Sequence, residues 1–197
     1  RGLGDVYKRQ EYFKEADPAH RSGAIQKLVP RALWWFRWGA MLTFLTGVAL
    51  LAYRHTGLTY AITIGSVLGT LMFLNVWLII WPNQKIVIAS ANAVAEGNDA
   101  LPEAAVAAPK AALASRTNTL FSAPMLFMMF ASGHLSLGSN TMLAAANGAS
   151  IAAVLLIIIL LEINAIFGKQ GPLTSVSGVI HCGLGLTAVF YLLMGLL

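Results

Sequence analysis

Long apolar runs separated by short polar stretches dominate the pattern of hydrophobic and polar positions along the chain. Five of them stand out, at residues 33–53, 58–81, 119–137, 142–167 and 174–197. A helix needs about 20 residues to cross the hydrocarbon core of a bilayer, so each run is long enough. None alternates with the period of two that a barrel strand requires, and only helices or closed barrels satisfy their backbone groups in lipid. The pattern therefore predicts an all-α fold: a polytopic integral membrane helical bundle with about five transmembrane helices.

The segments between these runs predict how the spans are connected. The short connections at 54–57 and 168–173 indicate that the spans they join are antiparallel neighbours. The longer stretch 82–118 is rich in alanine and is interrupted at Gly97 and Pro109. We expect it to form a cytoplasmic surface loop, with one or two short helices that lie on the membrane.

The N-terminal part of the chain lacks a long apolar run. Residues 11–32 predict a cytoplasmic amphipathic segment ahead of a transmembrane domain at 33–197. Residues 1–10, RGLGDVYKRQ, match the translation of a widely used sequencing adaptor and fit neither a signal peptide nor a helix start. We interpret them as a sequencing-adaptor scar, and expect the natural chain to begin near Glu11, within a longer gene.

Composition agrees with a membrane environment. The 197 residues are 57% hydrophobic and 11% charged, whereas soluble domains average about 25% charged residues. The net charge of +5 would suggest nucleic acid as the partner of a soluble chain. Here the preference of basic residues for cytoplasmic loops explains it, so we expect no nucleic-acid partner. The single cysteine excludes an internal disulfide, and without a CxxCH motif the sequence predicts no covalently attached c-type haem.

The basic residues also predict the orientation of the bundle. With the N-terminal segment inside, the cytoplasmic side holds Lys14, Arg21, Lys27, Arg31, Lys85, Lys110, Arg116 and Lys169. The outer loops hold only Arg54. This positive-inside bias places the C-terminus of a five-span chain outside.

Several polar residues fall within the apolar runs, where they are costly and are functional candidates. Most lie at similar depth near the inner ends of the spans: Arg37, Asn75, Asn118, Ser122, Glu162 and His181. Together they predict one polar cavity that opens toward the cytoplasm. His134 lies near the outer end of the third span.

Each candidate also has a structural interpretation. Arg37 can extend to the interface beside an aromatic belt, and Asn75 can form a helix–helix hydrogen bond. Glu162 needs a partner, a proton or water at its depth. His181 can accept a proton, bind haem or another metal group, or pair with Glu162. His134 can be an interfacial loop residue or a haem ligand. The sequence carries no HExxH or cysteine–histidine metal cluster, so we expect no metal site of those types.

The stretch NVWLIIWPNQK, at 75–85, combines anchoring and candidate chemistry. Trp77 and Trp81 are four residues apart and share a helix face suited to the interface. We expect Pro82 to stop the span and the amides of the next two residues to cap the freed carbonyls. Asn75 has no anchoring role and is the inward-facing candidate. Gly65 begins a GxxxG motif, which predicts close helix packing or a homo-oligomer.

Four stretches resemble one known family in the same order. They are LVPRALWWFRWGAMLTFLTG (28–47), NVWLIIWPNQK (75–85), ASRTNTLFSAPMLFMMFASGHL (114–135) and SVSGVIHCGLGLTAVFYLL (175–193). The family is the bacterial membrane-bound urate hydroxylases, whose membrane part is known as the urate oxidase N-terminal domain. The resemblance implies a multi-pass protein of the bacterial inner membrane with a periplasmic C-terminus. The family's leading span and the C-terminal cytochrome domain of many members have no counterpart in this sequence.

The resemblance implies a redox enzyme that oxidises urate to 5-hydroxyisourate and passes electrons to a c-type cytochrome, fused or separate, and not to oxygen. Glu162 and His181 are then the catalytic candidates for proton removal. Arg37, Asn75, Asn118 and Ser122 are the candidates for binding the small purine substrate. His134 is the candidate ligand of a haem, if this domain and not the partner cytochrome holds one. Two other functions fit the same sequence: a transporter that relays protons or solute, and a non-catalytic membrane anchor for a cytochrome.

Overall fold

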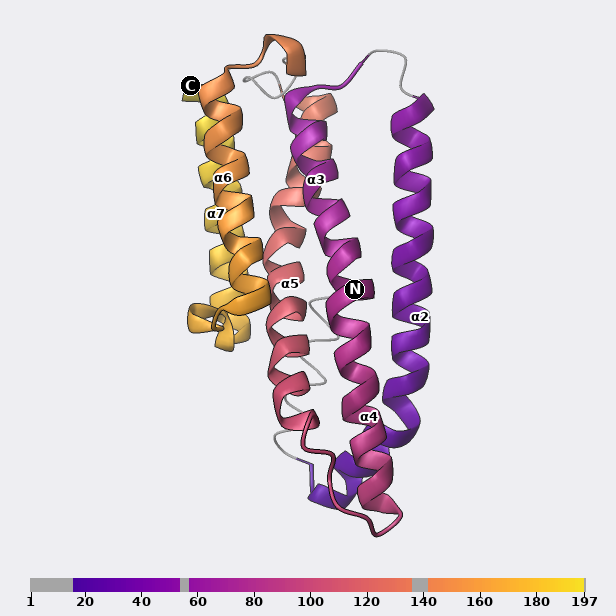
Figure 1. Ribbon diagram of the computed structural model, residues 1–197. Coiled ribbons are helices and arrows are strands. Elements are labelled where there is room, and N and C mark those ends of the chain that lie inside the picture. The colour runs from indigo at the N-terminus through magenta and orange to yellow at the C-terminus, as the bar shows by residue number, and fades with distance from the viewer. Residues whose placement is uncertain (1–15, 54–56, 136–141, 197) are drawn as a thin grey trace.

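The computed structural model describes residues 16–53, 57–135 and 142–196, which are almost entirely helical. The interpretation of residues 1–10 as an adaptor scar therefore concerns residues outside the described ranges. The main helices, in chain order, are α2 (Pro18–Tyr53), α3 (Tyr60–Leu74), α4 (Trp81–Ala95), α5 (Ala104–His134), α6 (Gly148–Phe167) and α7 (Val176–Leu196) (Figure 1). A π-helical stretch, η1 (Asn75–Ile80), joins α3 to α4, and 3₁₀ turns η2 (Leu143–Ala145) and η3 (Gly171–Thr174) precede α6 and α7. The described residues contain no β-strand, so the all-α prediction is confirmed.

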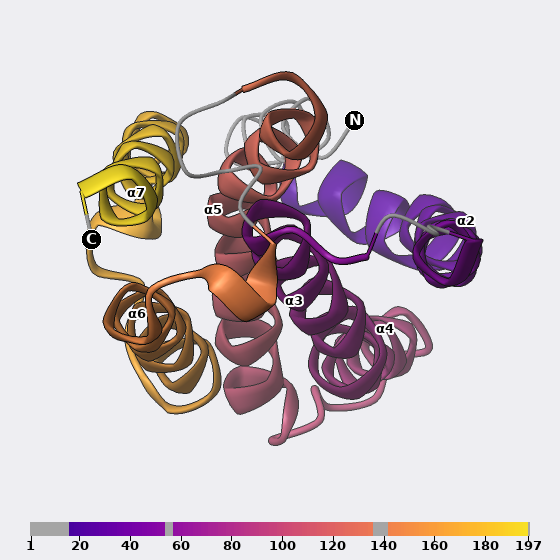
Figure 2. The same ribbon diagram turned by 90° about the horizontal axis from the view of Figure 1, so that it is seen from above.

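Helix α5 lies at the centre of the bundle. It packs against α3, η1 and α4 on one side and against α6 and α7 on the other (Figures 1 and 2). Its Phe121 and Met128 are fully buried, in one core cluster with Ile64 of α3, Ile158 of α6 and Phe190 of α7. The apolar side chains of α3, α6 and α7 thus meet those of α5 in one core.

Four helical stretches are long and apolar enough to cross a membrane: Ser22–Tyr53, Tyr60–Ala95, Gly148–Phe167 and Val176–Gly195. Within the described ranges α5 does not meet this criterion. The reason is its central position, because a helix enclosed by protein can carry buried polar residues such as Thr117 and Asn118. The prediction of a membrane helical bundle is confirmed, and its count of about five spans compares with four by this measure.

Pro82 does not end the second span, contrary to our expectation. Helix continues from Tyr60 to Ala95 through η1. Proline lacks an N–H and its ring collides with the carbonyl four residues earlier. The wider π-helical turn, in which the Trp81 N–H bonds to the Val76 carbonyl, lies directly before Pro82 and accommodates this change. The Asn83 amide donates to the Ile79 carbonyl at 2.7 Å, but it does so within a continuing helix and not as a cap at a helix end.

The stretch 82–118 also differs from the expected surface loop. Helix α4 ends at Ala95, and Gly97, with a φ of +85°, closes the end through bonds from Gly97 N to Val94 O and from Asn98 N to Ala93 O. These bonds form a Schellman motif. Helix α5 then begins at Ala104 and runs through Pro109 without a break. Its first turns bury alanine side chains in the region where it packs along α4: Ala107, Ala111 and Ala114.

The N-terminal segment is likewise part of a long helix. Helix α2 starts at Pro18, so most of the expected separate segment 11–32 is continuous with the first span. The Gln26 side-chain amide donates to the Ala91 carbonyl at 3.4 Å and ties this early part of α2 to the end of α4.

The helices differ in length, and the longer ones extend beyond the shorter ones at one end of the bundle. Helix α6 has 20 residues, or about 30 Å, which matches the hydrocarbon core. The 36-residue stretch Tyr60–Ala95 reaches about 54 Å, and α4 and the start of α5 extend past the α6–α7 connection (Figure 1). The described lysines and arginines all lie in the half of the bundle that contains α4, the start of α5 and the α6–α7 connection: Arg21, Lys27, Arg31, Arg37, Lys85, Lys110, Arg116 and Lys169.

Candidate functional site

Three of the predicted site residues meet inside the bundle and form what we call the polar triad: Asn75, Asn118 and Glu162. Asn75 begins η1, Asn118 lies in α5 and Glu162 lies in α6. The Asn75 side-chain amide donates to Asn118 Oδ1 at 3.0 Å and to Glu162 Oε2 at 3.2 Å. The triad therefore joins three helices that are far apart in sequence.

The two asparagines of the triad are buried and hydrogen-bonded. Asn75 is 1% exposed and Asn118 is 8% exposed. Asn75 uses both amide hydrogens within the triad, and Asn118 Nδ2 donates to the Met72 carbonyl at 2.9 Å. Glu162 is half-buried, and its Oε1 has no hydrogen-bond partner among the described residues. The triad thus retains one free acceptor, on a carboxylate.

The triad lies inside the apolar part of the bundle. Glu162 is six residues before Gly168, which ends α6, and Asn75 is six residues before Trp81. At 1.5 Å per residue, Asn75 and Glu162 are each about 9 Å from these two residues. Because their side chains are hydrogen-bonded to each other, Asn75 and Glu162 lie at one level of the bundle.

The chemistry of the triad suits a polar, nitrogen-rich ring. Amide groups pair with carbonyl oxygens and ring N–H groups, and a carboxylate oxygen accepts an N–H or takes up a proton. A bundle that needed only a helix–helix contact at this level would not require an ionisable group, whose placement inside a membrane is expensive.

Arg37 is not part of the triad. Its guanidinium carbon lies 3.9 Å from the ring centroid of Trp81, 5.1 Å from that of Trp77 and 5.8 Å from that of Trp38. Asn75 faces α5 and α6, whereas Trp77 and Trp81 meet α2. The predicted snorkelling beside an aromatic belt describes Arg37 better than a place beside Asn75.

The structure also leaves Ser122 and His181 outside the triad. The Ser122 hydroxyl donates to the Thr119 carbonyl of its own helix at 2.7 Å. His181 is exposed, and its Nδ1 lies 2.7 Å from the Ser177 carbonyl one turn earlier in α7. Neither residue has a contact with Glu162 among the hydrogen bonds of the described ranges.

The described residues do not bring His134 and His181 together as a pair of haem ligands. His134 is the last residue of α5, exposed and stacked on Phe130 at 4.6 Å between ring centroids. His181 is near the start of α7, two residues before Gly183, which packs against the backbone of Leu120. His134 is therefore about 20 Å further along α5. No group of three metal-ligating side chains occurs within the described part of the chain.

Arg116 is a buried polar residue that the sequence analysis assigned to the solvated inner loops. It is 5% exposed, and its guanidinium donates to the Leu173 carbonyl in η3. The signal for its burial was helical spacing, since Arg116 falls on the same stripe as Leu113 and Leu120. This arginine fastens the α6–α7 turn to the central helix.

A second polar group, which we call the hydroxyl cluster, lies at the other end of the bundle. It comprises Thr59, Tyr60, Ser132 and Ser150. Thr59 Oγ1 donates to Ser132 Oγ at 3.1 Å, the Tyr60 and Ser150 hydroxyls are 3.0 Å apart, and Ser150 Oγ donates to the Leu193 carbonyl at 2.7 Å. Because Ser150 has one hydrogen, Tyr60 is the donor to Ser150. The cluster links α3, α5, α6 and α7 through hydroxyls alone.

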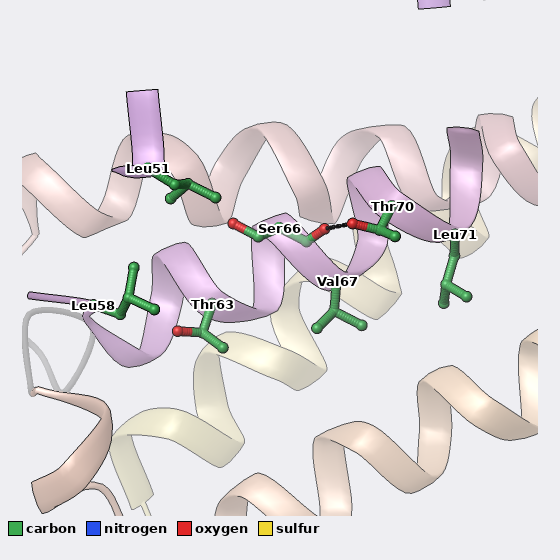
Figure 3. Close-up of a pocket in the computed structure, with 7 residues that line it drawn as sticks. All are labelled: Leu51, Leu58, Thr63, Ser66, Val67, Thr70 and Leu71. Carbon is green, nitrogen blue, oxygen red and sulfur yellow. Dashed lines mark hydrogen bonds between the residues drawn. The ribbon is translucent and has the colours of Figure 1, made fainter. Parts of the chain in front are cut away.

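An apolar groove of ≈ 280 Å³ lies along α3 beside the end of α2 (Figure 3). Its hydroxyl residues are Thr63, Ser66 and Thr70, and each donates to the carbonyl four residues earlier, at 2.9, 2.6 and 2.8 Å. With its donors used internally, the groove presents mainly hydrocarbon and carries no candidate chemistry. It does not include any residue of the triad.

Comparison with known proteins gives one match. The family model described as urate oxidase N-terminal matches residues 56–170, more than half of the chain. Searches of the curated proteins and of the solved structures gave no match. The matched range contains the whole polar triad and two of the four stretches that carried the resemblance, 75–85 and 114–135. Arg37 and His181 lie outside it.

Proposed function

Because the chain belongs to the urate oxidase N-terminal family, we propose that it is the membrane domain of a urate-oxidising redox enzyme that passes electrons to a c-type cytochrome. The family supports a function related to urate. The observation that carries the finer proposal is the polar triad, with its amides from two helices and its intramembrane carboxylate from a third.

Each member of the triad has a role in this proposal. Asn75 and Asn118 would exchange some of their mutual hydrogen bonds for bonds to the oxygens and ring N–H groups of urate. Glu162 would accept a proton through its free Oε1. Oxidation of urate to 5-hydroxyisourate adds the oxygen of one water and releases two electrons and two protons. The electrons reduce two molecules of a one-electron cytochrome, and one of the protons passes to Glu162.

The orientation of the bundle fits this direction of transfer. The described basic residues lie in the half that contains the triad, which we assign to the cytoplasm of a bacterial inner membrane. Urate would then enter from the cytosol. The C-terminal end of α7 would face the periplasm, where a c-type cytochrome, fused or separate, would receive the electrons.

The test is urate-dependent reduction of added c-type cytochrome by membranes that contain the full-length protein. Wild-type membranes should reduce two cytochromes per urate consumed. Glu162→Gln removes the proton acceptor and keeps the size of the side chain, and should lower the rate by about hundredfold. Glu96→Gln, an exposed carboxylate at the end of α4, is the matched control and should leave the rate unchanged. Equal rates for the two variants would reject the assignment of Glu162.

An intramembrane carboxylate that bridges helices also occurs in proton-coupled transporters, so transport is the second candidate. Sealed vesicles separate the two functions. Accumulation of unchanged urate, driven by a proton gradient and lost in Glu162→Gln, would establish transport and overturn the redox proposal. If vesicles that bind the cytochrome showed neither oxidation nor uptake, the remaining function would be a membrane anchor.

A further inference from the structure

The aromatic cage around Arg37, formed by Trp38, Trp77 and Trp81, is not used by the proposed function. It lies between α2 and the η1–α4 stretch, on the side of that stretch away from the triad. Lys85 adds a second cation, with its ammonium nitrogen 5.6 Å from the centroid of the Trp81 ring. The cage therefore gathers two positive charges around one indole.

Two hydrogen-bond donors in this cage find no acceptor in the part of the chain that the structure describes. Arg37 Nε and Trp77 Nε1 are buried, and neither has a partner among the described residues. Both groups donate and neither can accept, so they cannot satisfy each other. Buried donors are seldom left unpaired, because each such group loses its hydration without replacement. No acidic side chain of the described ranges forms an ion pair with Arg37. The described residues therefore supply no anionic acceptor to the cage.

The depth of the cage corresponds to the membrane interface. Trp81 is level with the end of α6, where the span of about 30 Å is complete. Trp34, Trp35 and Trp38 of α2 are 48%, 72% and 45% exposed, which is typical of an aromatic belt at the level of lipid headgroups. The most apolar 18-residue stretch of α2 has no residue buried by other parts of the protein.

We propose that the Arg37 cage binds the phosphate of an anionic phospholipid in the leaflet on the lysine- and arginine-rich side. Arg37 Nε and Trp77 Nε1 are covered by neighbouring side chains. These side chains move apart when the lipid binds, so that the phosphate oxygens accept from Arg37 and from the indole of Trp77, and Lys85 neutralises further headgroup charge. The acyl chains then run along the exposed apolar face of α2. A lipid meets both requirements of the cage, since its anion is held at interfacial depth and its chains cover the adjacent helix.

The test measures lipids retained by the purified full-length protein with native mass spectrometry, after exchange into nanodiscs of equal parts phosphatidylglycerol and phosphatidylcholine. The wild type should retain phosphatidylglycerol in preference. Arg37→Gln should lower that retention by about tenfold, the size expected from the loss of a charged hydrogen bond. Trp77→Phe keeps an aromatic ring of smaller size and removes the indole N–H, and should lower the retention by about threefold.

Matched controls separate the cage from general charge and aromaticity. Arg31→Gln removes an exposed cation from the same helix, and Trp35→Phe changes an exposed belt tryptophan. Both should retain phosphatidylglycerol as the wild type does. If Arg31→Gln and Arg37→Gln lowered retention equally, the cage would have no specific role and the proposal would be overturned.

A competition experiment with soluble anions tests whether the cage prefers lipid. Addition of inorganic phosphate or of urate should leave the bound phosphatidylglycerol in place. If either displaced it from the wild type at low ionic strength but not from Arg37→Gln, the cage would be a site for a soluble anion and not for lipid. Urate-dependent cytochrome reduction is measured on the same samples, so that failure of the lipid site and failure of the redox proposal are distinguishable.

Discussion

The polar triad and the hydroxyl cluster solve the same packing problem with different chemistry. Both join α3, or its continuation η1, to α5 or α6 through buried side chains, and they lie at opposite ends of the apolar bundle. The hydroxyl cluster uses only neutral groups and passes its last hydrogen to a backbone carbonyl. The triad uses two amides and a carboxylate, and leaves one carboxylate oxygen unbonded within the described residues.

This difference indicates that the hydroxyl cluster holds helices together, whereas the triad also carries a functional group. Hydroxyls are sufficient to hold helices together in lipid, at about 0.6 kcal/mol for an average interhelical hydrogen bond. An ionisable side chain adds a cost that such a bond does not repay. The hydroxyl cluster is therefore the reference for a purely structural contact, against which the effect of a change in the triad can be judged.

The largest expected difference is in activity. Glu162→Asp keeps the carboxylate but withdraws it by one methylene from Asn75. We expect urate-dependent cytochrome reduction to fall by roughly hundredfold, because small displacements of a reacting group carry penalties of that order. Tyr60→Phe, the comparison in the hydroxyl cluster, should retain the wild-type rate. Similar losses in both variants would mean that the assay reports the integrity of the bundle and not the chemistry of the triad.

The next largest effect is on stability. Asn118→Ala removes the acceptor of one Asn75 hydrogen and the donor to the Met72 carbonyl, and it empties part of a buried site. We expect the free energy of unfolding to fall by about 2 kcal/mol, measured by titration with sodium dodecyl sulfate from a mild detergent. Asn98→Ala, in the exposed α4–α5 connection, should change it little. A loss of the same size in Asn98→Ala would contradict the structural role of the triad.

Ser150→Ala tests the fastening role of the hydroxyl cluster. It deprives the buried Tyr60 hydroxyl and the Leu193 carbonyl of their shared partner. The free energy of unfolding should fall by about 1 kcal/mol, while cytochrome reduction stays at the wild-type rate. Loss of activity without loss of stability would place the hydroxyl cluster in the reaction.

The smallest effect is expected for the stability of Tyr60→Phe. This change removes one hydrogen bond but leaves Ser150 bonded to the Leu193 carbonyl, so no buried donor loses its partner. A decrease of about 0.6 kcal/mol in the free energy of unfolding is expected. If Tyr60→Phe were more costly than Ser150→Ala, the donor assignment within the cluster would be reversed.

The depth of the site residues could be predicted from the sequence, but their direction could not. Helix rise is constant, so counting from the ends of the apolar runs placed Asn75, Asn118 and Glu162 at one level, where the structure joins them. The same count placed Arg37 and His181 at similar depth, but in the structure Arg37 lies against Trp81 and His181 is exposed on α7. Which side of a helix faces its neighbours depends on the packing partners, and the widened turn of η1 alters that phase in a way that residue spacing does not reveal.

The stretch 82–118 shows a second limit of sequence reasoning. Pro82 and Pro109 indicated helix ends, because proline usually interrupts internal hydrogen bonds. A π-helical turn accommodates the first, and the second lies early in α5. The alanines that suggested weak surface helices instead allow α4 and α5 to approach closely. Composition identified small side chains correctly, but only tertiary packing decides whether such side chains cover a membrane or another helix.

The π-helical turn η1 also changes the direction in which the side chains after it point around the helix axis. A single residue inserted into or deleted from a helix turns everything beyond it by about 100°. Asn75, at the start of η1, faces α5 and α6, while Trp77 within η1 and Trp81 directly after it face α2. One helix can in this way address two unrelated neighbours at nearly the same level. A deletion within Asn75–Ile80 would leave the composition of the span almost unaltered and yet point its aromatic residues at the wrong partner.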